Sequence, residues 1–132
     1  MRLATWNLES VRPRAASRDA AFRAVMSAVA ADVWVLTETW RGFSPGEKYR
    51  LVAQSCDAAD LAQTPERRWV EIWVDETIAA RSLEVRRQRD RMCSARIESS
   101  SGGSTIVVGT VLPWANDRLW PVKGCIRVSH WR

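Results

Sequence analysis

The hydrophobic pattern of the first forty residues changes from the period of a strand to that of a helix and back. Residues 2–8 alternate as in a strand, and residues 32–39 contain the unbroken apolar run Val33–Leu36, which suits a strand buried on both faces. Between them lies one apolar helical face that ends near residue 31, and Ser17 is predicted to cap this helix. The order strand–helix–strand predicts two strands of one sheet with the helix on its face. The residues of the helical face are Ala21, Phe22, Val25, Met26 and Val29.

The remainder of the chain carries strand patterns joined by short turns. Strands are predicted at residues 49–55, 69–74, 91–98 and 105–112, with a Gly/Ser turn at 99–104. Residues 56–68 read as an irregular connection, residues 78–89 are amphipathic at best, and the pattern fades from residue 114 onward. No linker divides the chain, which predicts a single α/β domain with a mixed sheet over residues 1–132.

Composition limits the class of protein. The 132 residues carry 20 Lys and Arg against 15 Asp and Glu, a formal net charge of +5. Nearly all the excess is arginine, which favours phosphate-bearing partners, although a high-GC genome gives the same bias without selection for binding. The three cysteines form no C-x-x-C pair, which argues against a disulfide framework and a zinc site. The absence of a signal peptide and of ~20 consecutive apolar residues predicts a cytoplasmic protein that does not enter a membrane.

Two polar residues stand at the ends of the first two predicted strands. Glu38 follows the buried apolar run after Thr37, at the predicted end of the second strand, and Asn7 stands at the end of the first strand. In sheets covered by helices, ligands bind at the carboxyl ends of the strands. Glu38 is either a rim carboxylate paired with an arginine such as Arg41 or one half of a binding site. Asn7 is either a residue of the turn that ends the strand or the second residue of that site. Their occurrence together favours the site.

Two segments resemble the endonuclease/exonuclease/phosphatase superfamily: A-T-W-N-L-E at residues 4–9 and D-V-W-V-L-T-E-T at residues 32–39. Members of this family open with an apolar strand ending in Trp-Asn or Tyr-Asn, then a helix and a strand ending in Gln-Glu. The segments W-V-E-I-W-V at 69–74 and G-T-V-L-P-W at 109–114 are similar to later strands of the family. The resemblance covers about residues 1–118.

The resemblance implies a Mg²⁺- or Mn²⁺-dependent phosphoesterase or nuclease built as a four-layer α-β-β-α sandwich, of which this chain holds the N-terminal part. Carried over residue by residue, Glu38 holds the metal ion, and Asn7 is a catalytic residue that binds the scissile phosphate. Mg²⁺ prefers oxygen ligands, often one or two carboxylates with water and substrate phosphate. The implied partner is a phosphate ester or nucleic acid, hydrolysed by metal-assisted attack of water.

The sequence departs from the family at several positions. Thr37 stands where Gln is commonest, and Val111 where the family often has Tyr or His. No Gly-Asp-(aromatic)-Asn segment follows residue 118, and the single histidine, His130, does not match the family's Asp-His pair. We therefore expect a truncated domain that is incomplete or inactive as an enzyme and whose exposed sheet face associates with a partner. The alternative is a non-catalytic, Arg-rich remnant that binds nucleic acid.

Other candidate residues have a structural interpretation that we favour. Glu71 is expected on an exposed strand face, and the basic run from Arg81 to Arg91 on a solvated edge protected by charge. Trp40 and Trp114 stand near strand ends, where tryptophan stacks on a base or, more often, covers a core edge. The cysteines are expected as core thiols.

Overall fold

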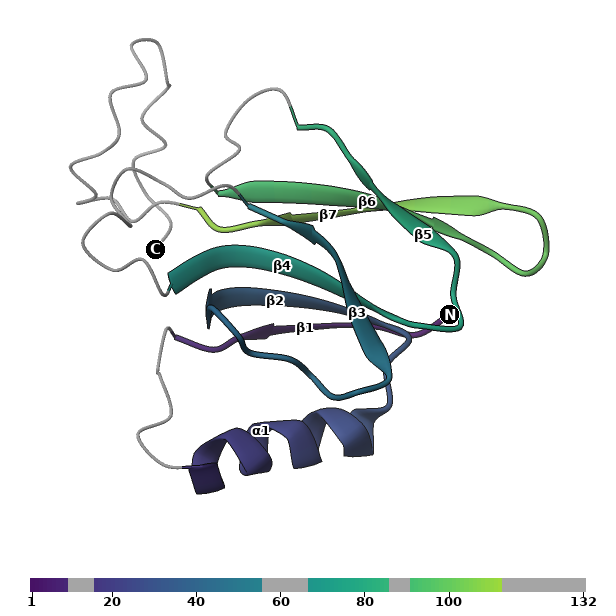
Figure 1. Ribbon diagram of the computed structural model, residues 1–132. Helices are drawn as coiled ribbons and strands as arrows, with labels where there is room; N and C mark the ends of the chain where they lie inside the picture. The colour runs from purple at the N-terminus through teal and green to yellow at the C-terminus, as the bar shows by residue number, and fades with distance from the viewer. Residues whose placement is uncertain (10–15, 56–66, 86–90, 113–132) are drawn as a thin grey trace, which may run out of the picture.

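The computed structural model describes residues 1–9, 16–55, 67–85 and 91–112. It forms three layers, with a helix below a four-stranded sheet and a three-stranded sheet above (Figure 1). No helix in these ranges is long and apolar enough to cross a membrane. The elements in chain order are β1 (Leu3–Asn7), α1 (Ala16–Val29), β2 (Val33–Trp40), β3 (Tyr49–Gln54), β4 (Arg67–Asp75), β5 (Ala80–Leu83), β6 (Met92–Glu98) and β7 (Ser104–Thr110).

The first sheet has the order β1-β2-β4-β3 and is mixed. β1 and β2 are parallel and are joined by α1, which confirms the predicted strand–helix–strand start, and β4 runs antiparallel to both of its neighbours. Their register runs from Leu3 beside Val33 to Asn7 beside Thr37. The carboxyl ends of β1 and β2 therefore meet at one edge of the sheet.

The second sheet is antiparallel, with the order β5-β6-β7. The strand β5 occupies residues that the sequence pattern describes only as amphipathic, because a four-residue strand is too short to show a period. Gly109 of β7 sits directly against the first sheet: a Cβ there would lie 2.5 Å from Cγ1 of Val70 and 2.9 Å from Cγ1 of Val35. This close approach places β7 over β2 and β4.

Two apolar clusters fill the spaces between the layers. The cluster between the sheets includes Val70, Ile72 and Val74 of the strand predicted at residues 69–74, all fully buried. The cluster between the first sheet and α1 includes Trp34 and Leu36 of β2. Because β2 contributes buried side chains to both clusters, its apolar run is buried on both faces, as predicted.

The helix differs from its prediction in two respects. It begins at Ala16, so Ser17 lies inside the helix and is not its cap. Met26 is fully buried, but Val25 and Val29 are 49% and 39% exposed. The predicted face was too wide because α1 presents only a narrow stripe to one sheet. Along that stripe Phe22 packs between Trp6 and Trp40, with ring centroids 5.2 and 6.2 Å away.

Three smaller expectations have mixed outcomes. Trp40 is buried and covers the edge of the helix-side core, as expected, while Trp114 lies outside the described residues. Cys93 is a buried thiol, and burial raises its pKa to about 12; the other two cysteines are outside the described residues. The basic run is not one solvated edge, because Arg81 is exposed but Arg91 is buried.

Candidate active site

The structure brings the two predicted site residues into contact. The side-chain amide Nδ2 of Asn7 donates a hydrogen bond to Oε1 of Glu38, at 3.1 Å. Asn7 ends β1, and Glu38 lies two residues before the end of its parallel neighbour β2. The Leu8 N–H donates to the carbonyl of Thr37 at 2.9 Å, which keeps the two strands together there. The contact therefore follows directly from the strand–helix–strand topology.

The orientation of the Asn7 amide is fixed by a second hydrogen bond. The backbone N–H of Glu9 donates to Oδ1 of Asn7 at 2.7 Å, in a turn that begins directly after β1. An amide with its oxygen engaged by an N–H must present its NH₂ group on the other side, which is the side of Glu38. Asn7 therefore has the turn role that the sequence offered, and the same side chain also contacts Glu38, the second candidate residue.

Glu38 has a backbone conformation that is unusual for its residue type, with φ +52°. Left-handed backbone costs a non-glycine residue about 1–2 kcal/mol and tends to occur at functional sites. By strand alternation, residue 38 would share the helix-facing side with Leu36, whereas Asn7 follows Trp6 and so lies on the opposite face. We attribute the meeting of the two side chains to the left-handed turn at Glu38.

Buried neighbours hold the chain on both sides of Glu38. The register passes from the pair Thr37–Val70 to the pair Thr39–Arg68, and Thr39 and Arg68 are both buried. Trp40 then packs on Phe43 with ring centroids 4.7 Å apart. A strained residue persists only where its surroundings determine its conformation, and these contacts supply that constraint.

Glu71 corrects a prediction, because it is 4% exposed rather than on an exposed face. It pairs in register with Leu36, and therefore faces the layer that α1 covers. Trp73 Nε1 donates to its Oε2 at 3.0 Å. Burial raises the pKa of the Glu71 carboxyl, while the bond from Trp73 opposes that shift. The alternation of Glu71 with valine and isoleucine suggested an exposed face, since the sequence does not show that a helix covers it.

Trp69 and Arg91 form a contact that the sequence did not suggest. The Arg91 guanidinium carbon lies 4.5 Å from the Trp69 ring centroid, a cation–π geometry. Trp69 lies on β4 between the residues that pair with Thr37 and Thr39, so it stands on the strand next to Glu38. Only the pairing of distant strands creates this contact, and no local pattern could have indicated it.

The chemistry of this pair fits a hard divalent cation. Glu38 is partly exposed at the strand end and offers carboxylate oxygens, which Mg²⁺ and Mn²⁺ prefer. In the described ranges, no cluster of three or more His, Cys, Asp or Glu side chains could hold a metal ion. A metal bound here would therefore rely on Glu38, water and substrate oxygens, the pattern typical of Mg²⁺ sites with few protein ligands.

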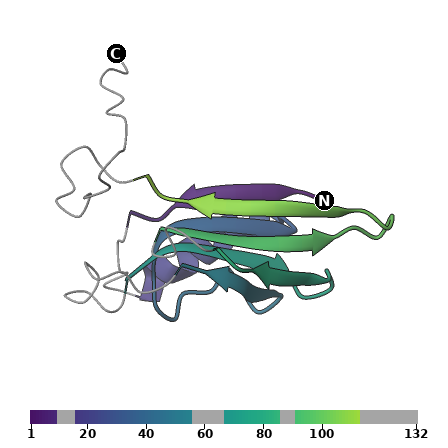
Figure 2. The ribbon, with the colours of Figure 1, turned by 90° about the horizontal axis from the view of Figure 1, so that it is seen from above.

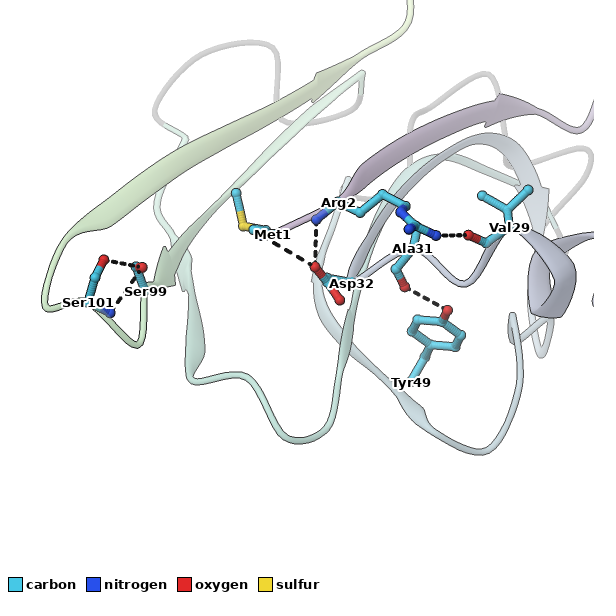
Figure 3. A network of polar contacts seen from close by, with 8 residues as sticks. All are labelled: Met1, Arg2, Val29, Ala31, Asp32, Tyr49, Ser99 and Ser101. Atoms are coloured by element: carbon cyan, nitrogen blue, oxygen red, sulfur yellow. Dashed lines mark hydrogen bonds and ion pairs between the residues drawn. The ribbon is translucent and has the colours of Figure 1, made fainter.

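A different carboxylate stands at the other end of β2. Asp32 Oδ2 accepts a hydrogen bond from the backbone N–H of Arg2 at 2.5 Å and lies 3.7 Å from the terminal amine of Met1 (Figure 3). Arg2 also donates from its side chain to the carbonyl of Val29 at 2.7 Å. A hollow of about 470 Å³ adjoins this end and is lined by Met1, Asp32, Thr77, Ile78, Ala79, Glu98, Ser99 and Ser100. The partners of Asp32 give it a structural role.

The sequence matches no family model and no curated protein. The structure is similar to that of the endonuclease domain of TRAS1, a telomere-specific non-LTR retrotransposon, with a TM-score of 0.58 and 16% sequence identity. The match covers 85% of this chain and 46% of that chain, so this chain spans about half of the length of the endonuclease domain. At this identity the likeness shows a shared fold.

Proposed function

We propose that Asn7 and Glu38 form the metal- and phosphate-binding part of a nuclease-type phosphoesterase site. The observation that carries the proposal is the 3.1 Å hydrogen bond between them near the carboxyl ends of two parallel strands. The similarity to the fold of an endonuclease domain supports it. The substrate would be a phosphate ester, with nucleic acid as the favoured class because of the Arg-rich composition.

Each residue has a distinct role in this proposal. Glu38 is the carboxylate ligand of Mg²⁺ or Mn²⁺, and the ion, when bound, polarises a phosphoryl oxygen and stabilises the leaving group. Asn7 is a neutral donor whose amide is oriented by the Glu9 N–H, so it can bind a phosphate oxygen without adding charge. The left-handed backbone at Glu38 keeps its carboxylate beside that donor.

We further propose that the chain corresponds to the N-terminal part of a four-layer α-β-β-α sandwich. Three of these layers occur in the described residues, and the match to the endonuclease domain covers less than half of that domain. The pair supplies groups for metal and phosphate but no general base for the attacking water. Mg²⁺-dependent turnover by this chain alone is therefore expected to be little or none.

The test is isothermal titration calorimetry with Mg²⁺ and with Mn²⁺. Wild type is expected to bind one ion, Glu38→Gln to bind at least tenfold more weakly, and Asn7→Ala to retain most of the affinity. Asp32→Asn is the matched control, because Asp32 directly precedes the same strand at its opposite end. Equal affinity of wild type and Glu38→Gln would contradict the proposal, as would robust nuclease turnover that Glu38→Ala does not affect.

The alternative function, metal-independent binding of nucleic acid by an Arg-rich surface, gives a different result. It predicts DNA binding that weakens steeply with salt, survives Glu38→Gln and needs no divalent ion. Measuring an oligonucleotide titration at two salt concentrations, with and without Mg²⁺, separates the two proposals.

A further inference from the structure

We propose that the buried carboxyl of Glu71 is a positioning group for the proposed site. It holds the cross-strand pair Thr39–Arg68, and this pair fixes the left-handed turn at Glu38. The inference rests on the proposed function, because it concerns the same site. Its test also has a readout in the metal-free chain, so the two can fail separately.

The turn at Glu38 interrupts the ladder between β2 and β4. The register has Thr37 beside Val70 and resumes with Thr39 beside Arg68, and the position between them is not registered as a pair. Glu38 stands at this position with a φ of +52°, which is unfavourable for a side chain with a Cβ atom. The turn therefore depends on the pair that closes the ladder beyond it.

Trp69, opposite Glu38, departs from strand alternation at the same position. Alternation places Trp69 with Glu71 on the helix side of β4, yet Trp69 packs against the cluster between the sheets and beneath the guanidinium of Arg91. Seen from above, β1 and β7 end at the same end of the sandwich, where β6 begins (Figure 2). Both β2 and β4 are therefore irregular at one position, close to the start of β6.

Glu71 interacts with both residues of the pair that closes the ladder. Burial raises the pKa of the Glu71 carboxyl, while a hydrogen bond from Trp73, the hydroxyl of Thr39 and the charge of Arg68 oppose this shift. Thr39, Arg68 and Glu71 are 0%, 5% and 4% exposed. Within the described residues, Oγ1 of Thr39 has no hydrogen-bond partner of ordinary geometry, so the nearby carboxyl is the acceptor to which it can turn.

Stability alone does not account for a carboxyl at this place. Taking a charge out of water is costly, and replacing a buried ion pair by apolar side chains is often neutral or stabilising. Leu36 pairs in register with Glu71 and belongs to the helix-side core, so an apolar residue 71 would also have suitable neighbours. A polar group that locks the residues around a site fits the position better.

Loss of the carboxyl should release the turn. Once Thr39 and Arg68 are no longer held, the backbone at Glu38 can relax to the extended conformation of the rest of β2. Strand alternation then carries the Glu38 side chain to the helix-facing side, away from Asn7 on the opposite face. The hydrogen bond between the two side chains and the proposed metal ligand would be lost together.

Two variants of residue 71 test the inference by two readouts. One is the NOE between the Asn7 side-chain amide and the Glu38 side chain in the metal-free, isotope-labelled chain, and the other is Mn²⁺ affinity by calorimetry. Glu71→Leu is expected to lose the NOE and to bind Mn²⁺ about tenfold more weakly. Glu71→Gln keeps an acceptor for Trp73 and a polar group beside Thr39, and should retain both.

Tyr49→Phe is the matched control for loss of a buried hydrogen bond. The Tyr49 hydroxyl donates to the carbonyl of Ala31 at 2.7 Å, at the end of the first sheet opposite Glu38. Its removal should lower stability and leave the NOE and the Mn²⁺ affinity unchanged. If Glu71→Leu behaved like Tyr49→Phe in both readouts, the inference would be overturned.

The readouts also separate this inference from the proposed function. A wild-type chain that shows the NOE but binds no Mn²⁺ contradicts the proposed metal site, and the NOE in Glu71→Leu still decides the role of Glu71. If Glu71→Leu does not fold, Trp73→Phe takes its place, because it removes the 3.0 Å hydrogen bond to the carboxyl and keeps an aromatic ring. It should weaken the NOE, and an unchanged NOE would overturn the inference.

Discussion

The two ends of β2 carry two carboxylates with contrasting environments. Asp32 precedes the strand and is held by the Arg2 N–H and the terminal amine of Met1, in the network drawn in Figure 3. Glu38 lies near the other end, has a left-handed backbone, and accepts one hydrogen bond from the exposed amide of Asn7. Asp32 joins two segments of backbone, whereas Glu38 faces a second polar side chain at the rim. The partners of Asp32 are main-chain groups, whereas the partner of Glu38 is another polar side chain, and the proposed metal site rests on this contrast.

The largest expected difference between the two carboxylates is in stability. Asp32→Ala removes a hydrogen bond from the Arg2 N–H and an ion pair, and should lower the free energy of unfolding by about 1–2 kcal/mol, an amount limited by partial exposure of the side chain. Glu38→Ala should change it by less than about 0.5 kcal/mol. Urea denaturation followed by circular dichroism measures both values. If Asp32→Ala and Glu38→Ala lowered the free energy of unfolding equally, the structural role assigned to Asp32 would not distinguish it from Glu38.

A smaller effect is expected from the backbone strain at Glu38. Glu38→Gly should be more stable than Glu38→Ala by roughly 0.5–1 kcal/mol, because glycine adopts positive φ without a Cβ clash, although its unfolded state has more entropy. Ala30, with φ +49°, is a matched control near the Asp32 end, and Ala30→Gly should stabilise by a similar amount. Thermal unfolding measures these differences. If Glu38→Gly unfolded at a lower temperature than Glu38→Ala, the backbone at residue 38 would not be strained.

The smallest expected effect concerns pH and the buried carboxyl of Glu71. Burial raises its folded-state pKa above the ordinary value of 4.5, so the folded state binds the proton more tightly than the unfolded state. Its contribution to stability is therefore fully present below 4.5 and is lost as the pH rises through the folded-state pKa. Glu71→Gln should flatten this part of the profile, and Asp32→Asn and Glu38→Gln should keep it. Melting temperatures measured across this pH range test the prediction. If the melting temperature of Glu71→Gln changed with pH as steeply as that of wild type, the prediction would be contradicted.

The strand–helix–strand start and the proximity of Asn7 to Glu38 could be predicted, because a crossover through a helix makes neighbouring parallel strands whose ends share an edge. The left-handed backbone at Glu38 could not, since Thr-Glu-Thr has no local preference for positive φ. The burial of Glu71 and the stacking of Arg91 on Trp69 were also missed. Both depend on which layers cover the strand and on pairing between distant segments.

The helix illustrates the same limit within one element. Its period was correctly identified, but Val25 and Val29 were assigned to the core although they are exposed. Periodicity gives the direction of an apolar face, whereas the width of that face depends on how much of the sheet the helix covers. Met26 belongs to that face and is buried, as predicted.

The central claim is that Glu38 with Asn7, and not Asp32, marks the metal site, and paramagnetic broadening by Mn²⁺ tests it most directly. The two carboxylates are about 20 Å apart, six residues along a strand. Titrating Mn²⁺ into ¹⁵N-labelled chain should broaden the amide signals of Leu8, Glu9 and Thr39 first and leave Val33 sharp. The broadening should disappear in Glu38→Gln. Broadening centred on Asp32, or broadening that Glu38→Gln does not change, would contradict the account.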